Sequence, residues 1–531
     1  MLVRVTADHH LRMRIDQISS DLADFIADDL TILNEERQDL MFRNIQGWED
    51  LPEYFHLVDI DDDGEHLIMP RGYKGRLVNL LRQQGYEVAV RDNHAWHKGS
   101  AYLGGHAKRI TYRPHQPLAI KRMRQYKQGI YVAPTGSGKT VTMCGLLTEI
   151  TPMRSLILVN RIDLVDQWIK RIHEHIGPAV AVGRIGEGKW SENRITVATL
   201  QTIWSRYEEL EDDWWDSWDL VCLDECHHVT AETFNAVMAN FSARYRFGMS
   251  ATPSKTGQFE LAQATLGNIF HEDDLDELVN LGVILKPSVI TVPTDFQGNF
   301  YGDHEGKKHP DHPELGFQCN VGGCNQKRPH HRNNYSEVLQ QLVADTSRAM
   351  TICDVIESER GNIQLIVTDQ VKQIDAIIAV ARIEHRDWFD EGIVHVITGK
   401  QTGKKRQAII EAIEQSGEAI CFTTVGAEGL DIPIINVVHV VFPTKNGDKI
   451  RQIIGRAMRT VAGKTQARVY DYFDQWTSVF NGQRRKRYKE CYFKMGLEIV
   501  GEDEARKEAA RDRMKSGELG SLVAARGGRT L

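Results

Sequence analysis

The chain has 531 residues, of which 41% are hydrophobic and 26% are charged, a balance typical of a globular protein of about three domains. Its 73 acidic and 65 basic residues give a net charge of −8, which excludes a histone-like protein that holds nucleic acid by bulk charge. No apolar run approaches about 18 residues and none lies near the start, so we expect no membrane span and no signal peptide. The eight cysteines are scattered, which favours a reducing compartment without disulfides.

The first segment, residues 1–108, contains short apolar runs and an acidic turn at residues 61–64. Apolar residues at Leu77, Leu80 and Leu81 have helical spacing, so the sequence predicts a helix there. We expect a small α+β accessory domain. It carries no obvious chemistry, and DNA recognition is one interpretation of its role.

From residue 109 onward, short β-rich runs alternate with helical patterns. This alternation predicts parallel sheets covered by helices on both faces. We predict two tandem α/β domains, at residues 109–284 and 285–480, followed by a basic, partly disordered extension at 481–531. Strands are expected at 129–134, 155–160, 195–199, 219–224 and 245–250, and then at 286–292, 363–368, 393–398, 418–423, 436–442 and 467–472.

Residues 296–334 interrupt the second domain and are rich in Gly, His, Asn and Pro, so we expect a Cys/His-rich insertion there. Two thiolates and two imidazoles at loop spacing can hold a tetrahedral Zn²⁺ and stabilise a segment too polar to form its own core. The alternative is a flexible loop without metal. The expected ligands are Cys319, Cys324, His330 and His331, with His309 or His312 as alternatives.

The run Ala133–Thr140 (APTGSGKT) lies between an expected strand and an expected helix. Its glycines let backbone N–H groups surround a phosphate, and the helix N-terminus adds positive potential. In such a loop Lys139 reaches the β- and γ-phosphates and the Thr140 hydroxyl ligates Mg²⁺. The strict pattern begins with Gly where this chain has Ala133. We nevertheless predict an ATP-binding loop, because the strand–loop–helix context is right.

A buried apolar strand ends in Asp224, Glu225, Cys226 and His227. Ligands of α/β sheets bind at the carboxyl ends of the strands. We expect Asp224 to hold Mg²⁺ and Glu225 to orient and deprotonate the attacking water. His227 is expected to be a coupling residue and not a base.

These segments resemble four motifs of superfamily 2 helicases, in the same order. The phosphate loop, the Asp-Glu-Cys-His box, the run 250–252 (SAT) and the run 452–459 (QIIGRAMR) look like motifs I, II, III and VI. Three further runs are similar to other motifs of the family. Residues 113–116 look like the adenine-recognition motif, and residues 198–202 look like a motif that contacts the nucleic-acid backbone. Residues 423–433 look like motif V. The resemblance covers about residues 109–480 and implies that the two tandem α/β domains are RecA-like.

Within the superfamily, the Asp-Glu-Cys-His box and the Arg113–Gln116 motif are most similar to the group of UvsW, RadD and XPB, which are DNA helicases and translocases. The run 69–72 (MPRG) is similar to a first-domain segment of phage-encoded members. Motif Ia departs from the usual pattern, because the backbone-contacting pair is Asn160 and Arg161. Both side chains can still donate hydrogen bonds to phosphate.

The resemblance implies four sets of site residues. Catalysis is assigned to Lys139, Asp224, Glu225, Arg456 and Arg459, and Mg²⁺ to Thr140 and Asp224. ATP binding is assigned to Arg113, Gln116, Thr135, Gly136, Ser137, Gly138, Lys139, Thr140, Gly429, Asp431 and Gln452. Coupling is assigned to His227, Ser250 and Thr252, and nucleic-acid contact to Asn160, Arg161, Thr199, Gln201, Thr368 and Thr424. For Thr368 and Thr424, capping at a strand end is the alternative.

The implied function is an ATP- and Mg²⁺-dependent DNA helicase or double-strand translocase with 3′-to-5′ polarity. It would act on branched DNA with little sequence specificity, in bacterial or phage-infected cytoplasm, alongside recombination or replication proteins. One alternative is an RNA-directed helicase. Another is a motor or clamp subunit that translocates on DNA without separating strands.

Three further runs are ambiguous. Basic residues cluster before the phosphate loop, from Lys108 to Lys127, and again at 484–489. Such runs are usually solvated faces, but the second contains a tyrosine and follows a helicase core, so nucleic-acid contact is an equal alternative there. The acidic and aromatic stretch 208–219 is expected to combine helix packing with a domain-surface loop, and a DNA site is the alternative.

Overall fold

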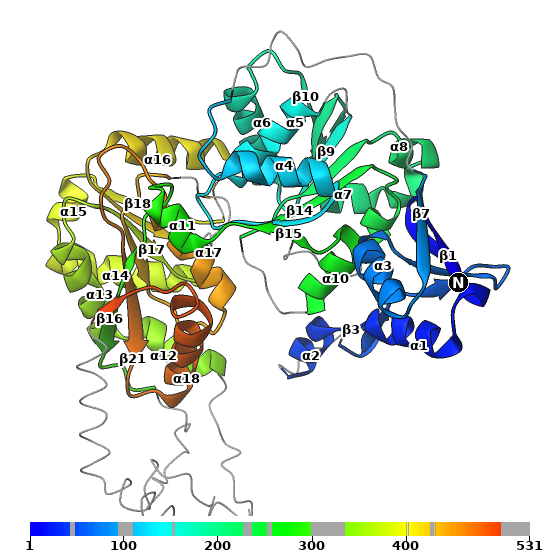
Figure 1. Cartoon of the computed structure of the whole chain (residues 1–531). Helices are drawn as coiled ribbons and strands as arrows, with labels where there is room; N and C mark the ends of the chain where they lie inside the picture. Colours follow the sequence, from blue (N-terminus) through cyan, green and yellow to red (C-terminus); the bar gives the residue numbers. More distant parts are fainter. Residues whose placement is uncertain are drawn as a thin grey trace, which may run out of the picture. The chain divides into compact units, whose positions relative to one another are not determined.

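The structure is a computed structural model that divides into two compact units, residues 1–284 and residues from 285 onward (Figure 1). It describes residues 1–42, 48–93, 110–150, 154–226, 236–251, 257–298, 335–399, 401, 403–424, 430 and 432–500. Within these ranges no helix is both long and apolar enough to span a membrane. The six cysteines in these ranges are all buried and free.

The N-terminal part of the first unit is an α+β layer built on a mixed sheet. Its strands, in the order β5-β6-β2-β1-β7, are Asp59–Ile60, His66–Pro70, His10–Arg14, Leu2–Ala7 and Glu87–Asp92. Alternate residues of β1 (Val3, Val5 and Ala7) are fully buried, as the period of two in a strand requires. Helices α1 (Ser20–Asp29) and α3 (Lys74–Gln83) supply the apolar faces of this core. Smaller elements are α2 (Glu35–Phe42), β3 (Thr31–Leu33) and β4 (Tyr54–His56).

The first α/β domain is built on an eight-stranded sheet in the described part of the first unit. In sheet order its strands are β11 (Lys189–Ser191), β10 (Val182–Gly186), β12 (Ile195–Thr199), β9 (Ser155–Val159), β13 (Leu220–Leu223), β14 (Tyr245–Ser250), β8 (Gln128–Val132) and β15 (Ile269–Glu272). All neighbouring strands are parallel except β11, which pairs antiparallel with β10. Apolar clusters cover both faces, so the predicted doubly covered parallel sheet is confirmed.

Helices of this domain flank the sheet. They are α4 (Gln116–Tyr126), α5 (Lys139–Glu149), α6 (Ile162–His175), α7 (Leu200–Ser205), α8 (Asp212–Asp216), α10 (Gly257–Leu266) and α11 (Leu275–Asn280). The aromatic stretch before β13 packs into the core as expected, because Trp215 and Trp218 are 4% and 1% exposed.

The N-terminal layer is fastened to the first α/β domain by the run 69–72. The Arg71 guanidinium donates to the carbonyl oxygens of Ala243 (2.7 Å) and Ser242 (3.2 Å). Gly72 packs against α10 so closely that a Cβ there would lie 2.4 Å from the Gly267 nitrogen. Only glycine fits this approach of two backbones.

Helix α10 is shared by two cores. Leu261 and Ala264 belong to the core of the N-terminal layer, whereas Phe259, Ala262 and Leu266 belong to the core of the α/β domain. The helix therefore buries apolar residues on two faces, while Glu260 stays exposed between them.

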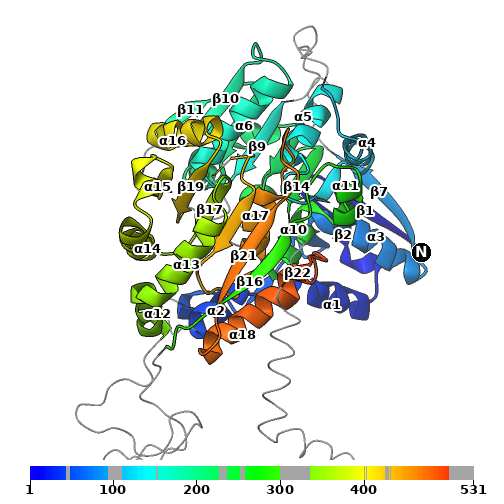
Figure 2. The ribbon, with the colours of Figure 1, turned by 90° about the vertical axis from the view of Figure 1, so that its left-hand side faces the viewer.

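The second unit contains a seven-stranded sheet in its described residues, and all of the paired strands are parallel (Figure 2). In sheet order they are β18 (Val394–Ile397), β19 (Ala419–Thr423), β17 (Ile363–Val367), β20 (Val437–Val440), β21 (Arg468–Asp474), β16 (Ser288–Thr294) and β22 (Ile499–Val500). Its helices are α12 (Tyr335–Ala344), α13 (Thr346–Ser358), α14 (Val371–Glu384), α15 (Asp387–Asp390), α16 (Gly403–Gln415), α17 (Gly447–Ala457) and α18 (Ser478–Arg487). This unit confirms the second predicted parallel-sheet domain.

Candidate ATP and nucleic-acid sites

The phosphate loop leaves the carboxyl end of β8 and enters α5. Gly136 and Gly138 have φ of 88° and 96°, a left-handed conformation that glycine adopts without steric cost. A Cβ at Gly138 would also lie 2.6 Å from the amide nitrogen of Gln116, so the loop requires glycine there. The Lys139 ammonium donates to the Ala133 carbonyl (3.0 Å), which holds it over the loop. The loop thus has the shape of a phosphate cradle at a helix N-terminus.

Residues 113–116 hold the phosphate loop from outside. The Arg113 guanidinium donates to the Gly136 carbonyl (2.6 Å), and the Gln116 amide donates to the Gly138 carbonyl (3.1 Å). Burial lowers the pKa of His115, so the neutral ring donates from Nε2 to the Ser137 carbonyl at 3.1 Å. Three consecutive carbonyls of the loop are therefore tied to one short segment. The segment that was expected to recognise adenine therefore fixes the conformation of the phosphate loop.

The acidic pair follows β13 and lies beside the phosphate loop. Glu225 has φ of 48°, and a non-glycine residue in this region costs about 1–2 kcal/mol. The Glu225 carboxylate lies 4.0 Å from the Lys139 ammonium, whereas Asp224 accepts from the Trp168 indole N–H at 2.8 Å. Burial, with the neighbouring charge of Glu225, raises the pKa of Asp224 to about 6. Keeping two carboxylates this close together is unfavourable because of their like charges. The arrangement therefore suits a site that binds a cation.

The residues at this edge of the sheet fit ATP with Mg²⁺. The Thr140 hydroxyl and the Asp224 carboxylate are hard oxygen donors of the kind Mg²⁺ prefers. The Ser137 side chain is fully buried, and its hydroxyl has no hydrogen-bond partner within the described part of the chain. Buried polar groups are normally paired, so this orphaned hydroxyl points to a missing ligand. Thr135 lies half-buried in the same loop.

Two residues at this site were not anticipated from the sequence. Trp168 orients Asp224 from α6, and Asp273 accepts from the Tyr131 hydroxyl at 2.5 Å and lies 3.8 Å from His115. Trp168 lies seven residues after Arg161, in the segment that follows motif Ia, and this position is the signal that could have found it. Asp273 follows β15, a strand that the sequence did not predict.

The nucleic-acid candidates of the first unit follow β9 and β12, two neighbouring strands of the sheet. Arg161 is ion-paired with Asp163 at 3.2 Å, and Asn160 is half-buried. Thr199 is 6% exposed and shares a 2.6 Å hydrogen bond with the Thr202 hydroxyl, whereas Gln201 is exposed on α7. The structure thus brings the four residues to the carboxyl edge. Ser250, assigned to coupling, is fully buried, and its carbonyl accepts from the Ala133 N–H at 3.0 Å.

In the second unit, Thr368 is 1% exposed and serves as a cap. Its hydroxyl donates to the Gln373 side chain and accepts from the Gln370 N–H at 3.3 Å, just before α14. This geometry matches the capping alternative. Thr424 is half-buried after β19, and its N–H donates to the Ile397 carbonyl at 3.3 Å.

The motif VI residues lie on and just beyond α17. Gln452 is 6% exposed, and the Arg456 guanidinium donates to the Leu430 carbonyl. Arg459 is half-buried and lies close enough to Lys464 to lower its pKa, although burial is the larger cause and brings that pKa to about 8. Two cations therefore stand together after the helix.

Several predicted site residues lie outside the described ranges. They are Gly429 and Asp431 of the ATP set, His227 and Thr252 of the coupling set, and Cys319, Cys324, His330, His331, His309 and His312 of the zinc set. Within the described ranges no group of three or more His, Cys, Asp or Glu side chains could hold a metal ion.

The basic run 484–489 is only in part a solvated face. Arg487 is 1% exposed and forms a buried ion pair with Asp471 at 2.7 Å, and the Tyr492 hydroxyl donates to the same carboxylate at 2.9 Å. The Arg484 guanidinium lies over the Phe473 ring at 3.9 Å. These two arginines therefore hold α18 against β21, while Arg485 stays exposed.

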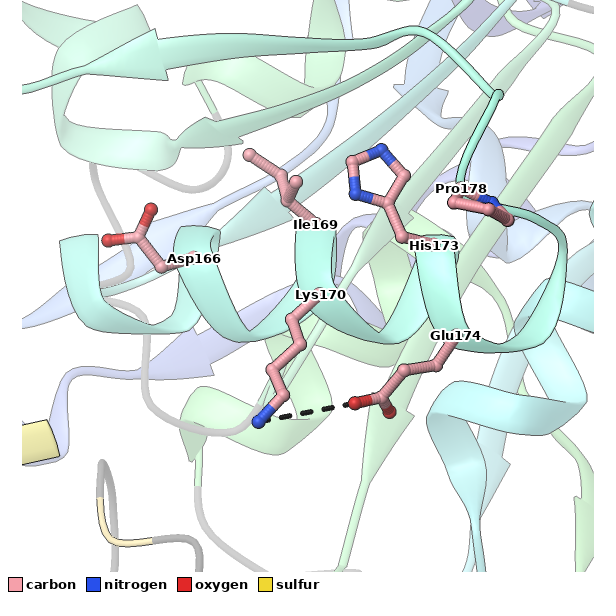
Figure 3. Close-up of a pocket in the computed structure, with 6 residues that line it drawn as sticks. All are labelled: Asp166, Ile169, Lys170, His173, Glu174 and Pro178. Carbon is pink, nitrogen blue, oxygen red and sulfur yellow. Dashed lines mark ion pairs between the residues drawn. The ribbon is translucent and has the colours of Figure 1, made fainter. Parts of the chain in front are cut away.

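A surface groove of about 490 Å³ follows the outer side of α6 (Figure 3). It contains none of the predicted site residues, and its Lys170 pairs with Glu174 at 4.0 Å, as the dashed line in Figure 3 marks. Its remaining lining residues are Asp166, Ile169, His173 and Pro178. No residue of the phosphate loop lines the groove. The groove lies along α6, which follows β9, whereas the phosphate loop follows β8.

Two family models match the chain. Residues 109–255 match the model described as "Type III restriction enzyme, res subunit", and residues 347–461 match "Helicase conserved C-terminal domain". The first match contains the phosphate loop and the acidic pair, and the second contains Arg456 and Arg459. The two matches fall in separate parallel-sheet domains.

Curated relatives span most of the chain. DNA 3′-5′ translocase XPB2 of Sulfurisphaera tokodaii is 25% identical over 394 residues, covering 71% of this chain and 85% of the relative. A protein of Acanthamoeba polyphaga mimivirus, provisionally named ATP-dependent RNA helicase L396, is 25% identical over 438 residues (80% and 74%). ATP-dependent DNA helicase uvsW of Enterobacteria phage T4 is 20% identical over 443 residues (77% and 79%). With both domain models and the geometry of the phosphate loop and acidic pair, these matches show that the chain belongs to the superfamily 2 helicases.

Proposed function

We propose that this protein is an ATP-dependent DNA helicase or translocase that acts on branched or double-stranded DNA. The proposal depends on one observation: the Lys139 ammonium of the phosphate loop lies 4.0 Å from the Glu225 carboxylate. Relatives named as DNA helicases and translocases that cover most of the chain support DNA as the substrate and 3′-to-5′ as the direction.

The residues of the first α/β domain divide the work of hydrolysis. Lys139 and the backbone N–H groups of the loop bind the β- and γ-phosphates, and Glu225 accepts the proton of the attacking water. Thr140 and Asp224 would hold Mg²⁺, which neutralises charge on the phosphates. The tie between Gln116 and the Gly138 carbonyl lets adenine binding set the conformation of the loop.

The proposal assigns charge neutralisation in the transition state to Arg456 and Arg459. Planar guanidinium groups suit this task because they can bind two phosphate oxygens at once. Gly429, Asp431 and Gln452 are assigned to the nucleotide, and His227, Ser250 and Thr252 to coupling. Asn160, Arg161, Thr199, Gln201 and Thr424 are assigned to the DNA backbone, where their contacts carry no sequence information. Thr368 would contact DNA only if its cap opened.

A substrate panel tests the proposal. ATP turnover is measured at fixed salt with forked DNA, single-stranded DNA, duplex DNA and duplex RNA, together with strand separation. We expect the forked or duplex DNA to stimulate turnover most. Preference for RNA would establish the RNA-directed alternative, and stimulation by forks without strand separation or branch migration would establish the translocating-clamp alternative.

We further propose that the Cys/His-rich insertion binds zinc, as an inference from sequence alone. Purified full-length protein is expected to contain about one equivalent of zinc by elemental analysis, because four ligands close one tetrahedral site. Changing Cys319 and Cys324 to Ser should remove it. Metal content below a tenth of an equivalent in the parent protein would refute the site.

We also propose that the protein works in the cytoplasm of a bacterial or phage-infected cell, with recombination or replication proteins as partners. The six cysteines in the described part of the chain are buried and free, which suits a reducing compartment.

A further inference from the structure

A group of polar side chains lies next to the phosphate loop in the first unit. His115 and Arg122 come from α4 and the residue before it, Tyr131 comes from β8, and His271 and Asp273 come from β15 and the residue after it. All but Arg122 are buried, and the Asp273 side chain, at the centre of the group, is 3% exposed. Of the five, only His115 belongs to a motif predicted from the sequence.

Asp273 is bound to the strand that leads into the phosphate loop. Its N–H donates to the carbonyl of Val132 (2.9 Å), the last residue of β8, and the loop begins at the next residue, Ala133. Its carboxylate Oδ2 accepts from the Tyr131 hydroxyl of the same strand at 2.5 Å. Burial, with the charge of Asp273, raises the pKa of Tyr131 well above its usual range, so this hydroxyl stays protonated and donates. The main chain and the side chain of Asp273 therefore both hold the end of β8.

The other oxygen of Asp273 faces His271. Oδ1 lies 3.0 Å from His271 Nε2, and Arg122 Nη1 lies 2.7 Å from Nδ1 of the same ring. A guanidinium can only donate, so Nδ1 accepts and the proton of the neutral ring is on Nε2, on the side of the carboxylate. The His271 ring is also stacked on the Tyr131 ring, with centroids 5.7 Å apart. One histidine thus connects Asp273 to the middle of α4.

His115 connects the group to the loop itself. Its Nε2 lies 3.8 Å from Asp273 Oδ2 and donates to the Ser137 carbonyl at 3.1 Å. Arg113 and Gln116, which hold two further carbonyls of the loop, flank His115 in the same segment. A displacement of this segment would therefore change the position of three loop carbonyls together.

The chemistry of the group requires a carboxylate at position 273. The Tyr131 hydroxyl and the protonated Nε2 atoms of His271 and His115 are all donors, and all face Asp273. An asparagine there would turn its NH2 group toward one of these donors. Two donors that face each other in a buried site are both left unsatisfied, so the groups move apart.

We propose that Asp273 is a positioning residue for ATP binding, which sets the conformation of the phosphate loop through the end of β8 and through residues 113–122. Its carboxylate is buried and both oxygens face protein groups, so it is not available to the nucleotide. The proposal rests on the proposed function, in which this loop binds ATP, but it does not depend on DNA as the substrate.

The test compares Asp273→Asn with the parent in full-length form. ATP turnover is measured over a range of ATP concentrations, with and without duplex DNA. We expect KM for ATP to rise on the order of tenfold while kcat changes by less than about twofold, because the loop binds the phosphates in the ground state and in the transition state. Affinity for a fluorescent ATP analogue should fall by the same factor.

Asp274→Asn is the matched control, since it makes the same substitution one residue further on. Asp274 is the N-cap of α11 and accepts from the Glu277 N–H at 2.8 Å, and asparagine caps a helix about as well as aspartate. The KM and kcat of this variant should match those of the parent.

Tyr131→Phe keeps the test decisive if Asp273→Asn does not fold. It removes only the hydroxyl that Asp273 accepts from, and we expect it to raise KM by about threefold. A merely structural role would reduce the folded fraction, which lowers the apparent kcat and leaves KM unchanged. An unchanged KM in folded Asp273→Asn, or in Tyr131→Phe if the first variant does not fold, would overturn the proposal. If the parent itself does not hydrolyse ATP under any of these conditions, the proposed function fails instead.

Discussion

Replacing Glu225 by glutamine is expected to lower kcat for DNA-stimulated ATP hydrolysis by about 10²–10⁴-fold, because general-base catalysis contributes that much. The amide keeps the shape of the side chain but cannot accept the proton of the attacking water. ATP binding should persist, since Lys139 and the phosphate loop are untouched. Turnover is measured at saturating DNA, and ATP affinity is measured with a fluorescent analogue.

Glu149→Gln provides the matched control. Glu149 ends α5, the helix that follows the phosphate loop, and its carboxylate pairs with Arg124 at the surface. This variant should retain full turnover. An unchanged kcat in Glu225→Gln would show that another group is the base.

Replacing Arg487 by methionine is expected to lower the free energy of unfolding of the second unit by about 3–5 kcal/mol, because Asp471 is left as an unpaired buried charge. Asp471 is fully buried and takes both the Arg487 and the Tyr492 hydrogen bonds. Differential scanning calorimetry of the full chain should show a lower melting temperature for one transition.

Arg485→Met removes the same type of side chain from the exposed face of α18, so its stability should change by less than about 0.5 kcal/mol. If Arg487→Met instead melts like the parent and binds DNA more weakly, the arginine contacts nucleic acid and its ion pair is dispensable. Duplex affinity is therefore measured on both variants.

Much of the two motor domains follows from local sequence. Central strands such as β9 and β13 are buried on both faces, so they appear as unbroken apolar runs. The phosphate loop depends on a short local pattern, and its strand–loop–helix context could be predicted without long-range information. The same is true of the acidic pair.

Strands that depend on long-range pairing were missed. β10 contains two glycines, and β15 has only four residues with a shifted register against β8, so neither has the composition of a strand. The burial of individual charged residues could not be predicted from the sequence either. Arg487 looks like its exposed neighbours in sequence, and only the helix phase against β21 buries it.

Local hydrogen bonds also determine whether a polar residue in a motif is available for a ligand or serves as a cap, as Thr368 does. The Thr368 hydroxyl meets a glutamine five residues later, a contact that depends on where α14 begins. The run 69–72 carried no chemistry that could be predicted from sequence. Its role follows from carbonyls about 170 residues away in the chain, which Arg71 reaches from the N-terminal layer.

The sharing of α10 between two cores makes the N-terminal residues inseparable from the motor domain that follows them. Deleting residues 1–108 would strip Leu261 and Ala264 of their cover and leave an apolar stripe open to self-association. A shortened chain that starts at the first helicase motif should therefore precipitate. An N-terminal layer supplied as a separate polypeptide would lack one wall of its interior, so neither piece is an autonomous folding unit.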